Sequence, residues 1–349
     1  MMKELQFKDE KNQNKYLIEL QNLKVYFELR EGTVRAVDGV SFAIEAGKTL
    51  GVVGESGCGK SVTSEAIMRL IPPPGTIIDG KIILRHNTGE EVNITNLKAN
   101  SSQMRQIRGN EISKIFQEPM TSLSPVHTIG NQISEVIILH QKLRKTQAKQ
   151  HAIEMLRHVG IPKPEDRYDS YPFELSGGMR QRAMIAMALA CNPSLLIADE
   201  PTTALDVTTE AQILDLMRSL QTEFNMAILF ISHNLGVIAE MADNVVVMYM
   251  GKNVEYAATE DLFYRPAHPY TLDLLRSIPR VNDTTQTRLY TITGNVPDPY
   301  NIPKGCSYHP RCSHAISGKC DVDRPVPLFE IEEGHHVRCW LYEDYAKVE

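Results

Sequence analysis

Several features that would define a protein class at once are missing from this sequence. The best apolar stretches, Ala183–Cys191 and Val245–Met250, are far shorter than the roughly 20 residues that a membrane-spanning helix needs. The first residues, MMKELQFKDEKNQNKY, carry charges where a secretory signal would need an apolar core. We therefore expect a protein that stays in the cytoplasm.

An excess of basic residues is also missing. The 37 Lys and Arg are outnumbered by 43 Asp and Glu, which gives a formal net charge of -6, whereas a nucleic-acid-binding domain is usually strongly basic. No internal repeat and no low-complexity tract is present. The 349 residues are 42% hydrophobic, which fits a packed globule with one large α/β domain and an appendage, or with two ordinary domains. Nucleic acid is thus not expected as a partner, and any anion site must be local.

Apolar periodicity predicts alternating strands and helices through the middle of the chain. Such alternation is typical of an α/β protein with a largely parallel sheet covered by helices. The expected elements are strands within 17–53, a helix over 60–70, strands and turns over 76–98, helices over 144–159 and 176–191, a strand over 195–199, a helix over 207–223, and strands over 227–232 and 245–250.

One segment has the pattern of a phosphate-binding loop. Gly54–Ser61, GESGCGKS, follows the apolar run TLGVV and opens a predicted helix, as the G-x-x-x-x-G-K-[ST] pattern requires. Glycines let backbone N–H groups approach a phosphate, Lys60 reaches its oxygens, and Ser61 offers a hydroxyl to Mg²⁺. A chance match in a chain of this length is a roughly one-in-a-hundred event. A solvated glycine turn is therefore the weaker interpretation.

A second segment supplies two adjacent carboxylates at the end of a predicted strand. Asp199 and Glu200 follow the apolar run LLIA, and the carboxyl end of a strand in a parallel sheet faces the ligand crevice. Asp199 is predicted to hold Mg²⁺, directly or through water, and Glu200 to orient or deprotonate the attacking water. Alone this pattern is weak, because strand ends often carry solvated acids. Together with the loop at 54–61 it is strong.

Between these segments lies Leu175–Arg182, LSGGMRQR, and here the sequence resembles the ABC (ATP-binding cassette) ATPase family, whose signature is LSGGQ. Met179 stands where the family has Gln. The phosphate contacts that the resemblance implies come from Ser176 and from the backbone of Gly177 and Gly178 at a helix N-terminus, so the departure is mild.

Four further family elements occur in the expected order. Gln117 in IFQEP resembles the Q-loop glutamine, Asp206 ends a TALD segment that resembles the D-loop, and His233 in FISHN resembles the switch histidine. Phe27 matches the family's aromatic residue that stacks on adenine, with Tyr26 as its competitor. Each residue alone could be a surface amide, a helix cap, a strand-end histidine or a core aromatic, so the order and spacing are the evidence.

The resemblance covers about residues 17–257 and implies a P-loop NTPase fold within a nucleotide-binding domain of residues 1–256. This fold has a RecA-like core, an antiparallel β subdomain and an α-helical subdomain near 120–190. Two subunits of the family sandwich two ATP molecules. The implied ATP contacts are Phe27, Ser56, Gly57, Cys58, Gly59, Lys60, Ser61, Val62, Gln117, Glu200 and His233, with Ser61, Gln117 and Asp199 at Mg²⁺. The implied catalytic residues are Glu200, His233, Gln117 and Lys60, and the residues facing the partner's ATP are Ser176, Gly177, Gly178 and Asp206.

Beyond residue 257 prolines become frequent and periodicity fades. The segment Tyr264–Thr271, YRPAHPYT, followed by GNVPDP and GCSYHPRC, resembles the C-terminal extension of ATPases from bacterial dipeptide and oligopeptide permeases. We therefore expect residues 257–349 to form such an extension. The resemblance implies peptide import at the cytoplasmic face of the membrane, with two membrane permease subunits, a second and different ATPase subunit, and an external peptide-binding protein.

The extension holds four of the six cysteines. A bound metal would give this segment the folding energy that a small core cannot, and structural disulfides are not expected in the cytoplasm. Four thiolates suit either zinc or a [4Fe-4S] cluster. The segment has no C-x2-C pair, and similar permease tails resemble iron–sulfur sites, so we expect [4Fe-4S] in a structural or sensing role, with Zn²⁺ as the alternative. The expected metal ligands are Cys306, Cys312, Cys320 and Cys339, and the histidines that could replace one of them are His309, His335 and His336. Cys58 and Cys191 lie outside this group and are expected to pack in the core.

Other functional classes remain open at this stage. An importer of nickel or another small solute would share the same core. A non-transport ABC ATPase that acts on DNA or ribosomes usually has two cassettes or a long coiled-coil insertion, which this chain lacks. A regulatory module without hydrolysis is disfavoured because Lys60, Asp199, Glu200 and His233 are all present.

Overall fold

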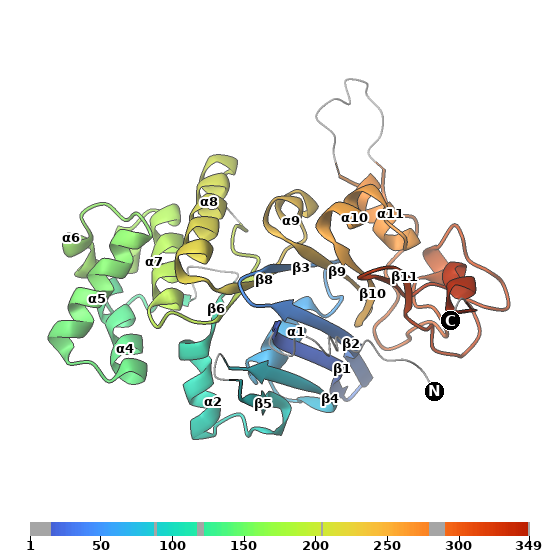
Figure 1. Ribbon diagram of the computed structural model, residues 1–349, viewed down its shortest axis with the longest axis horizontal. Coiled ribbons are helices and arrows are strands. Elements are labelled where there is room, and N and C mark those ends of the chain that lie inside the picture. Colours follow the sequence, from blue (N-terminus) through green and yellow to red (C-terminus); the bar gives the residue numbers. More distant parts are fainter. Residues whose placement is uncertain (1–14, 87–88, 117–121, 204, 279–289, 348–349) are drawn as a thin grey trace. The chain divides into compact units, whose positions relative to one another are not determined.

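The computed structural model describes most of the chain, namely residues 15–86, 89–116, 122–203, 205–278 and 290–347. The chain divides into two compact units (Figure 1). The first unit consists of Met1–Ala43, Leu50–Asn96 and Ser232–Glu349, and the second of Ile44–Thr49 and Leu97–Ile231. Within the described residues, we find no helix with the length and apolar character needed to span a membrane.

The first unit contains a four-stranded sheet with the order β2-β1-β4-β5. These strands are β1 (Tyr16–Leu29), β2 (Gly32–Glu45), β4 (Gly75–Arg85) and β5 (Glu91–Asn93). β4 pairs antiparallel with both β1 and β5, and Ile18 and Leu20 lie opposite Leu84 and Ile82. All four side chains are buried, because alternate residues of a strand face the same side. The buried face of this sheet thus forms part of the hydrophobic core.

Five more strands of the first unit follow the order β3-β9-β10-β12-β11. The strand β3 (Thr49–Val53) is parallel to β9 (Asn244–Tyr249), while β10 (Lys252–Ala258), β12 (His335–Val337) and β11 (Phe329–Glu332) pair antiparallel. Every residue of β3 is buried, as expected for a strand that is apolar on both faces. The helical segments are α1 (Lys60–Ile67), η1 (Ile94–Asn96), α9 (Leu235–Met241), α10 (Thr259–Tyr264), α11 (Pro269–Arg276), η4 (His309–Arg311) and η5 (Trp340–Lys347).

The second unit combines three parallel strands with a set of helices. The strands β6 (Ile112–Ile115), β7 (Leu195–Asp199) and β8 (Ala227–Ile231) pair in parallel, and β7 and β8 are buried throughout. The helices α4, α5, α6 and α7 pack against one another (Figure 1). The helical segments are α2 (Ser102–Gln106), η2 (Ile107–Glu111), α4 (Ile129–Gln141), α5 (Lys145–His158), α6 (Pro164–Tyr168), η3 (Pro172–Glu174), α7 (Gly177–Leu189) and α8 (Val207–Phe224).

The sequence explains where the longer helices begin and which face they bury. Thr128, Ser176 and Asp206 each accept a backbone N–H at the start of α4, α7 and α8, which satisfies a donor without a partner inside the helix. The buried residues of α8 recur at helical spacing, at Ile213, Leu214, Met217 and Leu220. The helices expected over 60–70, 144–159, 176–191 and 207–223 and the strands expected over 195–199, 227–232 and 245–250 are confirmed within a few residues.

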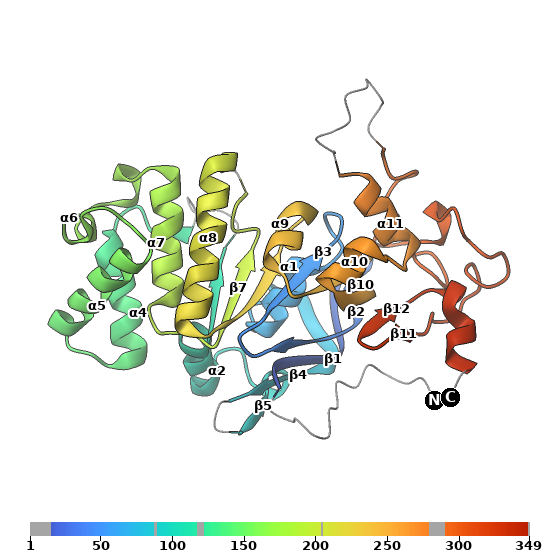
Figure 2. The same ribbon diagram turned by 45° about the horizontal axis from the view of Figure 1, so that its top comes forward.

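The C-terminal part of the first unit has a small apolar core of its own. Trp340, Phe329 and Val337 pack together there with two of the cysteines. Figure 2 shows β11 and β12 beside β10, in agreement with their strand pairing. The extension is therefore more ordered than its weak periodicity indicated. The buried residues of this core are Ala267, Cys320, Val326, Phe329, Val337, Cys339 and Trp340.

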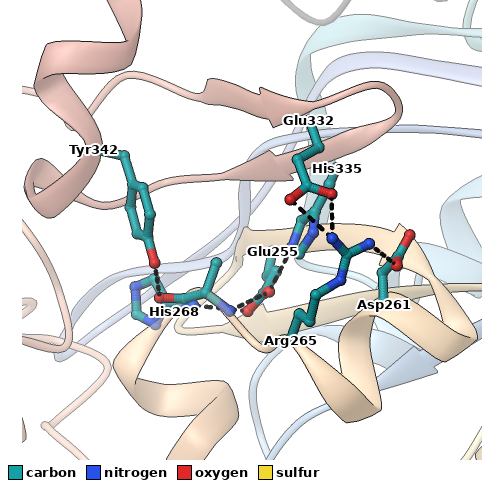
Figure 3. A network of polar contacts seen from close by, with 8 residues as sticks. Glu255, Asp261, Arg265, His268, Glu332, His335 and Tyr342 are labelled. Atoms are coloured by element: carbon teal, nitrogen blue, oxygen red, sulfur yellow. Dashed lines mark hydrogen bonds and ion pairs between the residues drawn. The ribbon is translucent and has the colours of Figure 1, made fainter.

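A buried carboxylate on β10 fastens the extension to the rest of the first unit (Figure 3). Glu255 is fully buried and accepts hydrogen bonds from the backbone N–H groups of Ala267 and His268, at 2.7 and 2.9 Å. Nε2 of His335 on β12 lies 2.8 Å from Oε1 of the same carboxylate. Three partners compensate the cost of burying this acid, so the position of the hairpin is strongly specified.

Candidate functional site

The loop between β3 and α1 forms an open cradle. Gly54, Gly57 and Gly59 have φ of 150, 79 and 104°, values that favour glycine. A Cβ at Gly54 would lie 2.2 Å from the carbonyl oxygen of Met248, and one at Gly59 would lie 2.2 Å from that of Ala36. A Cβ at Gly57 would meet no atom within 4 Å. The loop is thus packed against protein at two glycines and leaves space at Gly57, where a phosphate can approach.

Lys60 keeps its ammonium inside this loop. Its Nζ donates to the carbonyl oxygens of Gly54 (2.8 Å) and Glu55 (3.2 Å) and lies 3.9 Å from Sγ of Cys58. The first turn of α1 has no acidic residue to neutralise the positive end of the helix. A phosphate oxygen would be a much better acceptor than the sulfur for the third ammonium proton. Of the other predicted loop contacts, Cys58 and Gly59 are buried, Val62 is half-buried, and Ser56, Gly57 and Ser61 are exposed.

The residue before His233 makes a backbone hydrogen bond to β3. The N–H of Ser232 donates to the carbonyl oxygen of Val52 at 3.2 Å, and Val52 is two residues before Gly54. This contact holds the backbone of His233 beside the end of β3 from which the loop starts. Asn234, which caps α9, donates its N–H to Oγ of Ser232 at 3.0 Å, and the side chain of His233 is exposed.

The two aromatic candidates on β1 have different surroundings. Tyr26 donates its hydroxyl to Asp38 at 2.7 Å, and burial together with this bond raises its pKa to about 12. The N–H of Asp38 donates to the carbonyl oxygen of Gly251, and the N–H of Gly251 donates to that of Cys58 in the loop. Phe27 is half-buried and packs its ring against the first residue of β4. Hydrogen bonds thus connect Tyr26, rather than Phe27, to the glycine-rich loop.

Asp199, at the end of β7 in the second unit, has a partner that the motifs did not predict. Oδ2 of Asp199 lies 2.9 Å from Nζ of Lys114 on the neighbouring strand β6, and both side chains are less than a tenth exposed. Lys114 is the register partner of Ile197, two residues before Asp199, so both side chains face the same side of the strands. The predicted metal-binding carboxylate is thus already engaged by a buried cation.

Glu200 follows Asp199 in a conformation that is unusual for a residue with a side chain. Its φ is 49°, in the left-handed region, which costs about 1–2 kcal/mol for a residue with a Cβ. Its N–H donates to the carbonyl oxygen of Ile231, and its carboxylate accepts the hydroxyl of Thr203 at 3.1 Å. These two bonds hold Glu200 in this conformation. Strain of this kind is concentrated at functional sites.

The signature segment forms an exposed helix start. The hydroxyl of Ser176 caps α7, Ser176 and Gly177 are exposed, and a Cβ at Gly177 would meet no atom within 4 Å. Gly178 lies against Thr209, whose N–H bonds to the carboxylate of Asp206 at 3.0 Å. Hydrogen bonds from Thr209 also lower the pKa of exposed Asp206. The second unit therefore presents the start of α7 and the start of α8 together.

One buried amide connects the signature helix with the segment after β7. Gln181 is 1% exposed, and its side-chain amide donates to the carbonyl oxygen of Pro201. This contact was not predicted, although Gln181 is the first residue of the QR pair in the signature segment. Gln117, predicted at both ATP and Mg²⁺, lies outside the described residues.

The four cysteines of the extension lie near one another. Burial raises the pKa of Cys306 to about 11 and that of Cys339 to about 12, and the neighbouring thiols add to both shifts. Burial also raises the pKa of Cys312, with a further contribution from Cys320. Within the described ranges, however, no three His, Cys, Asp or Glu side chains are placed to hold one metal ion. The arrangement thus gathers four thiols without forming a finished metal site.

The histidines considered as substitute ligands have other contacts. His335 is engaged by the buried carboxylate of Glu255, and Nδ1 of His309 lies 2.9 Å from the carbonyl oxygen of Cys306. His336 is largely buried, which lowers its pKa, and it lies 4.0 Å from the carboxylate of Glu330. These contacts favour the cysteines over the histidines as ligands of any metal.

A glycine-rich loop between a buried strand and a helix, carboxylates at the end of a second strand and an LSGG-type helix start define a P-loop ATP-binding cassette. The family model described as "ABC transporter" matches residues 37–203, and that described as "Oligopeptide/dipeptide transporter, C-terminal region" matches residues 254–320. The oligopeptide transport ATP-binding protein AppD of Bacillus subtilis is 52% identical over 94% of this chain and 97% of its own length. The chain therefore belongs to the ABC transporter ATPase family, as its motifs predicted.

One further relative and two solved structures are also similar to this chain. The dipeptide transport ATP-binding protein DppD of Bacillus subtilis is 46% identical over 95% of this chain and 96% of its own length. The dimeric structure of MJ0796, a bacterial ABC transporter cassette, superposes with a TM-score of 0.59 at 25% identity over 69% of this chain and 98% of that chain. The structure of cbiO1 of Clostridium perfringens, part of the ABC transporter complex cbiONQ, shares the fold at 23% identity and a TM-score of 0.58 over 72% of this chain and 92% of its own. The predicted ABC ATPase fold is confirmed.

Proposed function

We propose that this chain is the ATP-hydrolysing subunit of an importer for dipeptides or oligopeptides. The observation that carries the proposal is the extent of the similarity, which includes both the cassette and the extension matched by the oligopeptide/dipeptide transporter model. Relatives at 46–52% identity over more than nine tenths of the chain are named as oligopeptide or dipeptide transport ATP-binding proteins. In functional terms, we assign residues 1–256 to the nucleotide-binding domain, with a helical part near 120–190, and residues 257–349 to the extension.

We propose the following chemical roles, which the sequence motifs imply and which contacts within each unit support in part. The cradle at Gly57 and the ammonium of Lys60 bind the phosphates of ATP, since both offer donors to an anion. Asp199 serves Mg²⁺ together with Ser61 and Gln117, because hard oxygen ligands suit this ion. The remaining assignments are Glu200 as the base or orienting group for water, His233 at the γ-phosphate, and Phe27 or Tyr26 at adenine.

Replacement of Glu200 by Gln tests the assigned hydrolysis. The variant should keep ATP binding and lose about 100-fold or more in turnover, because a general base contributes on this order. The matched control is Glu223→Gln, which alters an exposed acid of the same unit that lies 2.9 Å from His158. Turnover of Glu200→Gln equal to that of the control would reject the role of Glu200.

We further propose that the functional particle contains two ATPase subunits. Ser176, Gly177 and Asp206 are exposed within the second unit, so they are available to the nucleotide of another subunit. A different ATPase subunit is the proposed partner, with two membrane permease subunits at the cytoplasmic face of the membrane and an external peptide-binding protein. Purification of the tagged chain from membranes tests this. Recovery of two membrane subunits and a sister ATPase supports it, and recovery of ribosomes or DNA instead contradicts it.

We also propose that Cys306, Cys312, Cys320 and Cys339 hold a [4Fe-4S] cluster, with Zn²⁺ as the alternative. Support comes from the grouping of four cysteines, of which Cys320 and Cys339 are buried, in which burial and neighbouring thiols raise the pKa of Cys306, Cys312 and Cys339. A bound metal would require the thiols to lose their protons, which the positive charge of the ion favours. Elemental analysis of anaerobically purified protein provides the test. Iron with broad visible absorbance supports the cluster, zinc alone supports the alternative, and neither metal contradicts both.

A further inference from the structure

An arginine of the extension forms an ion pair with the phosphate-binding loop. Arg311, in η4 and directly before Cys312, places Nη1 2.7 Å from Oε2 and Nη2 3.0 Å from Oε1 of Glu55, the second residue of the loop motif. The two side chains are 4% and 25% exposed. Two parallel N–H···O bonds of this kind fix geometry as well as charge. The extension therefore holds the loop carboxylate through a specific and largely buried contact.

Arg311 is itself held in place by its surroundings. Its Nε donates to the carbonyl oxygen of Thr293 at 3.1 Å, and its guanidinium lies over the rings of Tyr249 and Tyr308, 5.9 and 5.8 Å from their centroids. Tyr249, Tyr270 and Tyr308 also contact one another, with centroids 4.7 to 5.2 Å apart. An arginine on such a platform loses little further freedom when it pairs with a carboxylate.

A second residue of the extension holds the backbone of the same loop position. The N–H of Glu55 donates to the hydroxyl of Tyr270 at 2.8 Å, and Tyr270 is fully buried in α11. Glu55 is thus held at its backbone by Tyr270 and at its carboxylate by Arg311. Both contacts lie within the first unit and join parts of the chain that are more than 200 residues apart.

Glu55 in turn contacts the lysine of the loop. Its carbonyl oxygen accepts the Nζ proton of Lys60 at 3.2 Å, so the position of Glu55 helps to orient the ammonium. We propose that Arg311 is a positioning residue for ATP binding, which holds Glu55 and through it Lys60. The inference rests on the proposed role of Gly54–Ser61 as the phosphate-binding loop.

Charge gives Arg311 a second effect. Without its partner, the carboxylate of Glu55 would add an uncompensated negative charge to a loop that receives a polyphosphate, and like charges repel strongly at a partly buried site. Arg311 removes this repulsion while it fixes the loop. ATP affinity therefore depends on the order of the segment that contains Arg311 and Cys312, whether or not a metal is bound there.

Measurement of ATP affinity in the full-length chain tests the proposal. Arg311→Met should weaken binding of a fluorescent ATP analogue about tenfold, a size typical of coupling between sites. Arg311→Lys keeps the charge without the paired bonds and should show a smaller loss. Arg311→Met with Glu55→Gln should bind more tightly than Arg311→Met alone, because the repelling charge is gone. Arg265→Met is the matched control, since it breaks the exposed pair with Glu332 in the same extension.

The outcomes separate positioning from general destabilisation. Thermal melting without nucleotide measures the stability of each variant. The ATP affinity of the folded fraction measures how well the phosphate-binding loop is positioned. Affinities of both Arg311 variants within twofold of wild type would overturn the proposal. So would an equal loss in Arg265→Met, or a double variant that binds no better than Arg311→Met. If Lys60→Ala binds ATP as tightly as wild type, the loop assignment itself fails.

Discussion

Replacement of Lys114 by Met is expected to destabilise the metal-free protein and to make Mg²⁺ with ATP a stronger stabiliser. Nζ of Lys114 lies 2.9 Å from Asp199, and neither side chain is more than 7% exposed. Removal of one partner from a buried pair typically costs about 3–5 kcal/mol. Because Asp199 has further interactions, we expect the lower end, about 3 kcal/mol, which corresponds to a fall in Tm on the order of 6 °C.

Mg²⁺ should reverse this effect. A divalent cation at Asp199 supplies the positive charge that Lys114 provides in the metal-free protein, so the ion and the lysine compete for one carboxylate. The Met variant should therefore bind Mg²⁺ with ATP more tightly than wild type. Its Tm should rise by more than that of wild type when Mg²⁺ and ATP are added together, because at equal ligand concentration a tighter ligand stabilises the folded state more, by RT ln(1 + [L]/Kd).

Thermal melts of the full-length chain in EDTA, in ATP with EDTA, and in ATP with Mg²⁺ provide the assay. The matched control is Lys149→Met, which removes an exposed partner 3.8 Å from Asp169 and should cost less than about 0.5 kcal/mol. An equal fall in Tm under all three conditions would refute the competition between Lys114 and Mg²⁺. A rise in Tm with Mg²⁺ and ATP that is smaller in the Met variant than in wild type would refute it as well.

Two further predictions follow from the first unit. Gly59→Ala should destabilise the fold by about 3 kcal/mol or more, because its Cβ would meet the carbonyl oxygen of Ala36. Gly57→Ala should cost only about 1 kcal/mol but abolish ATP binding, because its Cβ would point into the open space of the loop. Thermal melting and nucleotide titration of both variants check this, and equal melting temperatures of the two variants would contradict it. Burial lowers the pKa of His268 to about 4, so wild-type stability should fall by up to about 3 kcal/mol as the pH drops from about 6.5 to 4, since only the unfolded state takes up the proton. His268→Asn, which keeps an acceptor for the N–H of Tyr270, should lack this loss in urea unfolding at both pH values, and an unchanged pH dependence would show that another group is responsible.

The local motifs could be predicted because their chemistry is local. Gly54–Ser61 needs glycine at particular backbone angles and a lysine at the start of a helix, and Ser176 and Asp206 cap helices within three residues of themselves. Such requirements are written in short runs of sequence. The strand before the loop and the helix after it follow from apolar patterning. The cassette and its expected elements can therefore be predicted from the sequence.

The partners of these motifs could not be predicted. Arg311 and Glu55 are 256 residues apart, and although Arg311 lies in the segment GCSYHPRC, nothing in that segment indicates a contact with the loop at 54–61. Lys114 lies in the short strand ISKI, which was not among the expected elements, and its contact with Asp199 depends on the register of β6 against β7. A shift of one residue in that register would turn the lysine to the other face.

The sequence by itself determined the family, the loop that receives phosphate, the two carboxylates after β7 and the presence of four cysteines in the extension. Only the tertiary structure decided which buried polar side chains meet. It joined Arg311 to Glu55, Lys114 to Asp199 and His335 to Glu255, and it gave the extension a core of its own. The physical reason is that glycine angles and helix caps are set by neighbours in the chain. Buried ion pairs depend instead on strand register and loop closure over tens to hundreds of residues.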